Sequence, residues 1–228
     1  MNHFMGLLRD KQLPQRTVLY IFGIFLISLG AAFNIVSDIG VSAMQAPSLI
    51  LSLATGLSIG TWLFLMLATF ILLQILILRR EFRLVSLAQI VVSFVFGYFM
   101  DFSTFLVRGL QPSSYIEQLL LFGIGTILSI NGVMLYVRAN LINMPPEALT
   151  TAITKKIPNG KFHRVRIVQD CSLVVIAAVL SFLLLHGLYG IREGTVLSAV
   201  LIGKGIPYAS RLWQPVLRRI GLGVEGVG

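Results

Sequence analysis

The chain has 228 residues, of which 56% are hydrophobic and 12% are charged. A soluble domain normally carries about twice that charged fraction, so water is excluded as the main solvent of this protein. The net charge of +9 is typical of membrane proteins whose Lys and Arg gather in cytoplasmic loops, so we expect no nucleic-acid partner. Cys171 is the single cysteine, and the three histidines are too scattered to form a metal site.

Six apolar stretches have 18 residues or more, enough to cross a hydrocarbon core that takes about 20. In chain order they are residues 17–36, 60–78, 84–106, 116–137, 167–188 and 196–213. The last is the most polar, because it contains Lys204 and Arg211. The sequence therefore predicts an all-α fold, a polytopic membrane bundle of about six transmembrane helices.

Two shorter segments, residues 44–54 and 144–157, follow the first and the fourth stretch, and each has proline near its start. As helices they reach about 17 to 21 Å, which is too short to cross the bilayer. Such segments mark the binding sites of many transporters. The alternative interpretation is a pair of interfacial helices that only brace the bundle.

Basic residues predict the orientation, because short loops rich in Lys and Arg stay in the cytoplasm. Arg79, Arg80 and Arg83 follow the second stretch; Lys155, Lys156, Lys161, Arg164 and Arg166 follow the fourth; Arg218 and Arg219 follow the sixth. With six spans, all these residues lie on the side of the basic N-terminus. We expect an inner-membrane protein with a cytoplasmic segment 1–16, a single transmembrane domain 17–214 and a cytoplasmic tail 215–228.

The two halves, about residues 17–108 and 116–214, resemble each other at an offset of 100. Identical pairs include Gly23 and Gly123, Met44 and Met144, and Gly60 and Gly160. Each half has a span, a short proline-marked segment and two further spans. Because three spans are an odd number, the second half enters the membrane from the opposite face, which predicts an inverted 3+3 repeat.

Polar residues within the third stretch fall on one helical face. They are Gln89, Ser93, Gly97, Asp101 and Thr104. A charge inside the membrane faces the bundle interior or a water-filled cavity, so this face is predicted to point inward. Asp101 is a candidate substrate or proton site. The alternative is an acid at a helix end, paired with Arg108.

Four further polar residues are candidates, each with a structural alternative. Asn131 lies beside a stripe of small residues, Gly125, Ser129 and Gly132, that is typical of close helix packing. Glu147 begins the second short segment, where a carboxylate also suits a helix N-terminus. Asp170 follows Arg166 by four residues, as in a helical ion pair. Lys204 lies between two glycines and before Pro207, so the backbone could depart from helical form there. A lysine in this place could bind an anionic group or pair with Asp101, and the alternative is a lysine whose side chain extends to the membrane interface.

Five segments together resemble the YczE/YyaS/YitT family of bacterial membrane proteins over nearly the whole chain. They are RTVLYIFGIFLISLGAAF, GVSAMQAPSLILSLATGLSIGTW, FGYFMDF, MPPEALTTAI and GIREGTVLSAVLIGKGI. The resemblance assigns the family's Gly-Val-Ser turn to residues 40–42, its Gly-then-Asp element to Gly97 and Asp101, and its Glu-Gly-Thr element to residues 193–195. After the turn the family often has proline and an acidic residue, where this chain has Ala43, Met44 and Gln45.

We expect a secondary transporter or exporter of a small, charged or amphiphilic metabolite. The alternative is a substrate-binding or accessory membrane subunit that works with a partner protein and neither transports nor catalyses alone. No hydrolase, metalloprotease or P-loop motif occurs, so we expect no enzyme activity and no cofactor. Expected partners are membrane lipids and the substrate, with a homodimer or partner subunit left open. The candidate binding residues are Gln45, Ser93, Gly97, Asp101, Asn131, Glu147, Asp170, Glu193 and Lys204.

Overall fold

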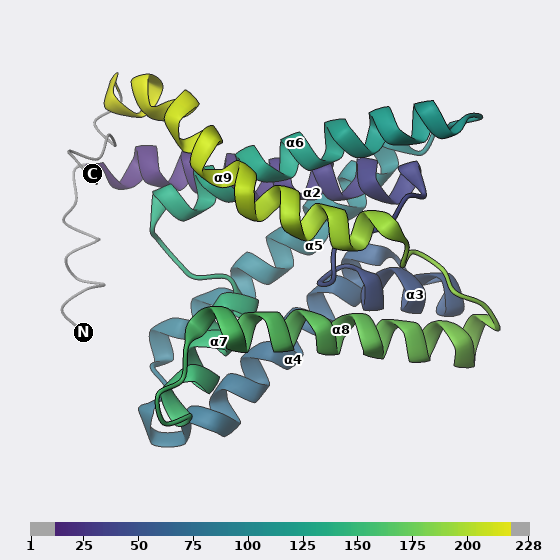
Figure 1. Cartoon of the computed structure of the whole chain (residues 1–228). Helices are drawn as coiled ribbons and strands as arrows, with labels where there is room; N and C mark the ends of the chain where they lie inside the picture. The colour runs from purple at the N-terminus through teal and green to yellow at the C-terminus, as the bar shows by residue number, and fades with distance from the viewer. Residues whose placement is uncertain (1–11, 220–228) are drawn as a thin grey trace.

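The computed structural model describes residues 12–219, which are helical and contain no strand (Figure 1). Residues 1–11 of the expected N-terminal segment and 220–228 of the expected tail lie outside the described residues. The elements are α2 (Leu13–Ser37), α3 (Ala46–Thr55), α4 (Ile59–Leu78), the 3₁₀ turns η1 (Arg79–Glu81) and η2 (Leu84–Leu87), α5 (Ala88–Val107), α6 (Tyr115–Ala139), α7 (Pro145–Lys156), α8 (Phe162–Leu185) and α9 (Glu193–Arg219).

Local sequence explains where the helices begin and end. Proline lies in the first turn of α2, α3 and α7, where its missing N–H costs no hydrogen bond. Ser58 and Ser114 cap α4 and α6 by accepting hydrogen bonds from backbone N–H groups two to three residues into each helix. Asp38 and Asn140 end α2 and α6 in the left-handed conformation.

Five helices in the described part are long and apolar enough to span a membrane, whereas the sequence predicted about six. They are α2, α4 with η1, η2 with α5, α6 and α8. α9 has the length, 27 residues, but its charged residues and glycines make it too polar for this criterion. The chain is thus an all-α polytopic membrane protein. The helix break considered near Pro207 is absent, because α9 continues through Pro207 and Pro215.

The centre of the bundle is the antiparallel pair of α2 and α6, which contact each other along their lengths. Glycines bring the two backbones together: a Cβ added at Gly23 would lie 2.7 Å from the backbone N of Tyr136, and one added at Gly132 would lie 2.6 Å from the carbonyl oxygen of Gly23. Gly30 and Gly125 meet in the same way. The predicted role of the α6 small-residue stripe in close packing is confirmed.

The short helices lie at opposite ends of this pair, and each contacts a long helix from the other half of the chain. α3 packs on α8 and α4, and α7 packs on α4 and α8. α5 contacts α2 and α4, while α9 contacts α6. The start of α7 therefore lies among helices from both halves, as Figure 1 shows near the lower left of the bundle.

Candidate functional site

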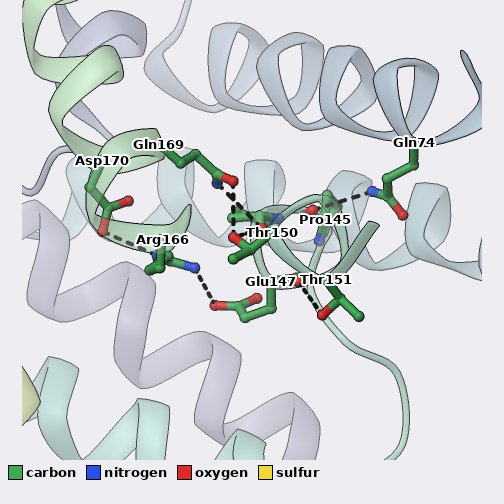
Figure 2. Close-up of polar contacts among 9 residues, drawn as sticks. Gln74, Pro145, Glu147, Thr150, Thr151, Arg166, Gln169 and Asp170 are labelled. Atoms are coloured by element: carbon green, nitrogen blue, oxygen red, sulfur yellow. Dashed lines mark hydrogen bonds and ion pairs between the residues drawn. The ribbon is translucent and has the colours of Figure 1, made fainter. Parts of the chain in front are cut away.

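The candidate site is at the first turn of α7, which is held in place by amide side chains from two other helices. Gln74 of α4 donates to the carbonyl oxygen of Pro145 at 3.2 Å, and Gln169 of α8 donates to that of Pro146 at 3.3 Å. The hydroxyl of Thr150 donates to Gln169 Oε1 at 2.9 Å. Figure 2 shows these contacts on both sides of the α7 turn. The amides thus fix the helix start against α4 and α8.

Glu147, next in the same turn, is held by an arginine that serves two carboxylates. Arg166 of α8 donates to Glu147 Oε1 at 3.2 Å and to Asp170 Oδ2 at 3.1 Å (Figure 2). The three side chains are only 28% to 36% exposed. Two carboxylates share one guanidinium, so with both ionised the cluster carries a net charge of −1. Asp170 makes the predicted i, i+4 pair, and Arg166 also links α8 to α7.

The second oxygen of Glu147, Oε2, is buried and has no hydrogen-bond partner among the described residues. Burial raises the pKa of Glu147, while the charge of Arg166 and the neighbouring Tyr136 act in the opposite direction. Beside it, the rings of Tyr136 and Tyr20 pack edge to face at 5.8 Å, and the Tyr20 hydroxyl donates to the Ile142 carbonyl oxygen at 2.8 Å. The arrangement can accept a proton or a hydrogen-bond donor at Oε2.

The raised pKa of Glu147 predicts a pH-dependent stability. Because the folded protein holds this proton more tightly than the unfolded chain, Glu147 destabilises the fold at pH values above its raised pKa, and acidification removes that penalty. We expect the melting temperature of the wild type, relative to Glu147→Gln, to rise as the pH falls from 8 to 5. Parallel melting curves across this range would contradict the expectation. Glu193→Gln, at an exposed acid, is the control.

Asp101 belongs to α5, and its carboxylate lies away from this site, at the start of α4. Its two carboxylate oxygens accept hydrogen bonds from the Gly60 backbone N–H and the Ser58 hydroxyl, each at 2.7 Å. Arg108 stacks on the ring of Phe105, with its Cζ 4.0 Å from the ring centroid. This placement favours the interpretation of Asp101 as an acid at a helix end, although its partner is a helix N-terminus rather than Arg108.

The other candidates on α3 and α5 are engaged in packing. Gln45 is buried and accepts from the Ser42 hydroxyl at 2.8 Å. Ser93 is fully buried and donates to the Gln89 carbonyl oxygen. A Cβ added at Gly97 would lie 2.7 Å from the Gly60 carbonyl oxygen, so this glycine permits α4 and α5 to touch. The predicted inward face of α5 is confirmed at Gln89, Ser93 and Gly97.

The remaining candidates lie on or beside α9. Asn131 accepts from the Trp213 indole at 2.7 Å and so links α6 to α9. Glu193 is exposed and pairs with Arg192, which also meets Asp38. Lys204 is exposed. The possibility of a buried lysine paired with Asp101 is therefore wrong, since the carboxylate of Asp101 is bound by Ser58 and Gly60.

Of the nine candidates, the structure brings together Glu147 and Asp170 at Arg166, and Gly97 and Asp101 at Gly60. It also adds contacts and residues that sequence reasoning missed. Arg166 was expected to pair with Asp170, as it does, but its contact with Glu147, 19 residues earlier, gave no local signal. Gln74 did offer a local signal, because a glutamine within an apolar span needs a buried hydrogen-bond partner. Tyr136 offered none. Among residues 12–219, no group of three His, Cys, Asp or Glu side chains could hold a metal ion.

Comparison with known proteins places this chain in a family. The profile of a family of unknown function, DUF6198, matches residues 14–211. The chain is 28% identical over 196 residues to the uncharacterized membrane protein YczE of Bacillus subtilis (strain 168), covering 85% of this chain and 84% of YczE. It is 29% identical over 135 residues to the uncharacterized protein YyaS of the same organism, covering 59% of this chain and 66% of YyaS. No solved structure matches. The resemblance to YczE and YyaS is confirmed.

Proposed function

The chain belongs to the DUF6198 family, whose function is unknown, and we propose that it is a secondary transporter that moves a small charged or amphiphilic metabolite. Glu147 would be the group that binds a proton or accepts a hydrogen bond from the substrate. The observation that carries the proposal is the buried Oε2 of Glu147, which has no partner within hydrogen-bond geometry and lies in a membrane domain beside Tyr136. A carboxylate oxygen without a donor is costly in such a place, and a bound proton or substrate group would remove that cost.

The location of Glu147 supports this role. It lies at the start of a short, proline-marked helix, and helix starts of this kind form the binding sites of several transporter folds. Helices α4, α7 and α8 come from both halves of the chain and meet there. A movement of one half against the other would therefore change the surroundings of Glu147, as alternating access requires.

The inverted repeat is supported by the way the helices pair. Exchanging the halves turns the contact of α2 with α5 into that of α6 with α9, and the contact of α3 with α8 into that of α7 with α4. Both members of each exchanged pair occur. α2 and α6 each have 25 residues, and both ends of α6 lie 102 positions after those of α2. Both helices also end in a left-handed residue whose N–H bonds the carbonyl three residues earlier.

One contact breaks this symmetry. α4 and α5 touch closely at Gly60 and Gly97, whereas α8 and α9, which correspond to them, do not pack along each other. Ion pairs link elements at both ends of the bundle: Asp38 with Arg192 at one, and Glu81 with Lys156 at the other. A closed hairpin in one half and an open one in the other is the asymmetry expected of a single state of an alternating-access cycle.

We infer that α9 is a sixth crossing and that both termini are cytoplasmic. α9 runs parallel to α6: Gly194 lies against Phe122 near the start of α6, Gly205 against Ile130, and Ser210 accepts a hydrogen bond from Arg138 near its end. A helix that accompanies a span over this length crosses with it. Six crossings then keep the basic clusters on one side, as the positive-inside rule requires.

The test is solute uptake by proteoliposomes. Purified protein is first screened by thermal shift against amino acids, organic acids, amines and phosphate esters at pH 5.5 and 7.5, because a ligand of the folded state stabilises by mass action. Uptake of each stabilising compound is then measured with an inward proton gradient. We expect uptake by the wild type, and in Glu147→Gln a fall to the level of empty liposomes. Glu193→Gln is the matched control and should keep the wild-type rate.

The outcomes also separate the transporter from the accessory subunit. A compound that binds and stabilises the protein but is not taken up under any gradient would favour the accessory subunit. Wild-type uptake by Glu147→Gln would overturn the assignment of the site to Glu147.

A further inference from the structure

A row of exposed cations follows one face of α9. Lys204, Arg211 and Arg218 are spaced by seven residues and are all exposed. Seven residues are nearly two helical turns, so the three side chains share a face, with successive residues about 10 Å apart. The residues of α9 that are buried against the bundle lie on the opposite face. They are Thr195, Ser198, Ala209 and Leu217, with the buried Gly194 at the edge of that face. The cationic stripe, residues 204, 211 and 218, therefore points away from the protein.

In the topology proposed above, with α9 as a sixth crossing, the deepest member of the cationic stripe lies well inside the bilayer. Gly205, next to Lys204, packs against Ile130 of α6. Ile130 is nine residues from the end of α6 at Ala139, or about 14 Å along the helix axis. The hydrocarbon core is about 30 Å thick. A lysine that is exposed on the lateral surface at this depth is costly unless an anion or water reaches it.

The anion does not come from residues 12–219. Seven acids occur there, and each has an ion pair or hydrogen-bond donor elsewhere. They are Asp38, Glu81, Asp101, Glu117, Glu147, Asp170 and Glu193. A second copy of the chain is also a poor partner. A two-fold interface on this face would place the cationic stripe against itself, and like charges at low dielectric repel.

We propose that the cationic stripe binds an anionic phospholipid of the cytoplasmic leaflet. Arg211 and Arg218 lie at and beyond the level of Arg138, at the end of α6, where lipid phosphates are found. Lys204 extends along α9 toward the same phosphate, with its methylene stem against the acyl chains. Exposed apolar side chains flank the stripe and suit those chains. They are Leu197, Val200, Leu201, Tyr208 and Leu212. Basic surfaces at this membrane level recognise anionic headgroups.

Native mass spectrometry of the full chain, delipidated in detergent, tests the proposal. The probes are dioleoyl phosphatidylglycerol, tetraoleoyl cardiolipin, dioleoyl phosphatidylcholine and glycerol 3-phosphate, which carries the phosphate without chains. The test variant combines Lys204→Ala, Arg211→Ala and Arg218→Ala. The control removes three exposed cations elsewhere, through Arg79→Ala, Arg80→Ala and Arg83→Ala. The oligomeric state is read from the same spectra.

We expect the wild type and the control to bind the two anionic lipids, and the test variant to bind them on the order of 100-fold more weakly, because each cation near an anionic headgroup contributes about a factor of five. Phosphatidylcholine and glycerol 3-phosphate should not bind. Equal weakening in both triple variants would overturn the proposal. So would a test variant with wild-type lipid affinity that has lost a dimer, since the stripe would then be a protein interface. If the triple variant does not fold, Lys204→Ala alone should still weaken binding several-fold, and an unchanged affinity in that variant would overturn the proposal.

Discussion

Replacement of Gly30 by valine is expected to abolish the stable fold or to lower its melting temperature by roughly 10 °C. A Cβ at this position would overlap the carbonyl oxygen of Gly125 and the hydroxyl of Ser129 on α6. The obstacle is partly backbone, so no change of side-chain rotamer relieves it. α2 and α6 would have to separate, and the contacts of the central pair would be lost. Fluorescence-detected size exclusion and a thermal scan in detergent measure the effect.

Gly123→Val is the matched control for this substitution. Gly123 lies on α6 within one turn of Gly125, yet an added Cβ there meets no atom within 4 Å. A β-branched residue is tolerated in a membrane helix, so we expect wild-type behaviour. If both valine variants lost stability equally, the loss would reflect glycine at these positions in general, and the close approach of α2 and α6 would not be its cause.

Replacement of Arg166 by methionine is expected to lower the free energy of unfolding on the order of 2 kcal/mol, between the values for exposed and fully buried ion pairs. Methionine keeps much of the apolar stem but leaves Glu147 and Asp170 without their shared cation. Two neighbouring carboxylates would then repel each other at low dielectric. The melting temperature of the purified protein at pH 7.5 is the measurement.

Arg164→Met and a double variant complete this experiment. Arg164 is exposed and two residues earlier, so its replacement should change the melting temperature little. Adding Glu147→Gln to Arg166→Met removes one of the two unpaired carboxylates and should restore part of the lost stability. Additive effects of Glu147→Gln and Arg166→Met would mean that the ion pair does not couple α7 to α8.

Hydropathy and proline predicted most of the helices, and the sequence already indicated that the last one is the most polar. Spans and short segments follow from local composition, so α2 to α8 appear close to the expected positions. α9 packs on α6 but is too polar to meet the hydropathy criterion that the five other long helices meet. The ends of α2 and α6 give an offset of 102 between these two helices, in place of the 100 used for the whole repeat. Gly23 corresponds to Gly125 rather than Gly123, if α2 and α6 are aligned by their ends.

The offset between the two halves changes along the chain because the linkers differ in length. Residues 38–45 connect α2 to α3, whereas residues 140–144 connect α6 to α7. The second linker is three residues shorter, so the offset of 102 between the first helices falls to 99 between Ala46 and Pro145, where the short helices begin. A single offset of 100 lies between these two values and matches neither pair of helices. Identities counted at that offset cannot identify equivalent positions in both helices.

The candidate site was only half predictable for a similar reason. Asp170 and Arg166 are neighbours on one helix, so their spacing indicated the pair. The contact of Glu147 with Arg166, and those of Gln74 and Gln169 with the α7 turn, join helices whose arrangement is tertiary. Asp101 was a candidate because it is a charged residue within a predicted span. Its partner Ser58, which caps α4, lies 43 residues away in the sequence, so this contact could not be predicted from local spacing.

The packing of α3 on α8 has a consequence for how the protein is made. Val41, Ala46, Leu49 and Ile50 are buried together with Ala177 of α8, which the ribosome adds more than a hundred residues later. Until then, this apolar surface of α3 lacks its main cover while the insertion machinery handles the intervening spans. The nascent chain must therefore hold an unfinished short helix at the membrane surface during most of its synthesis, and a protein truncated before α8 should be a substrate for membrane proteases.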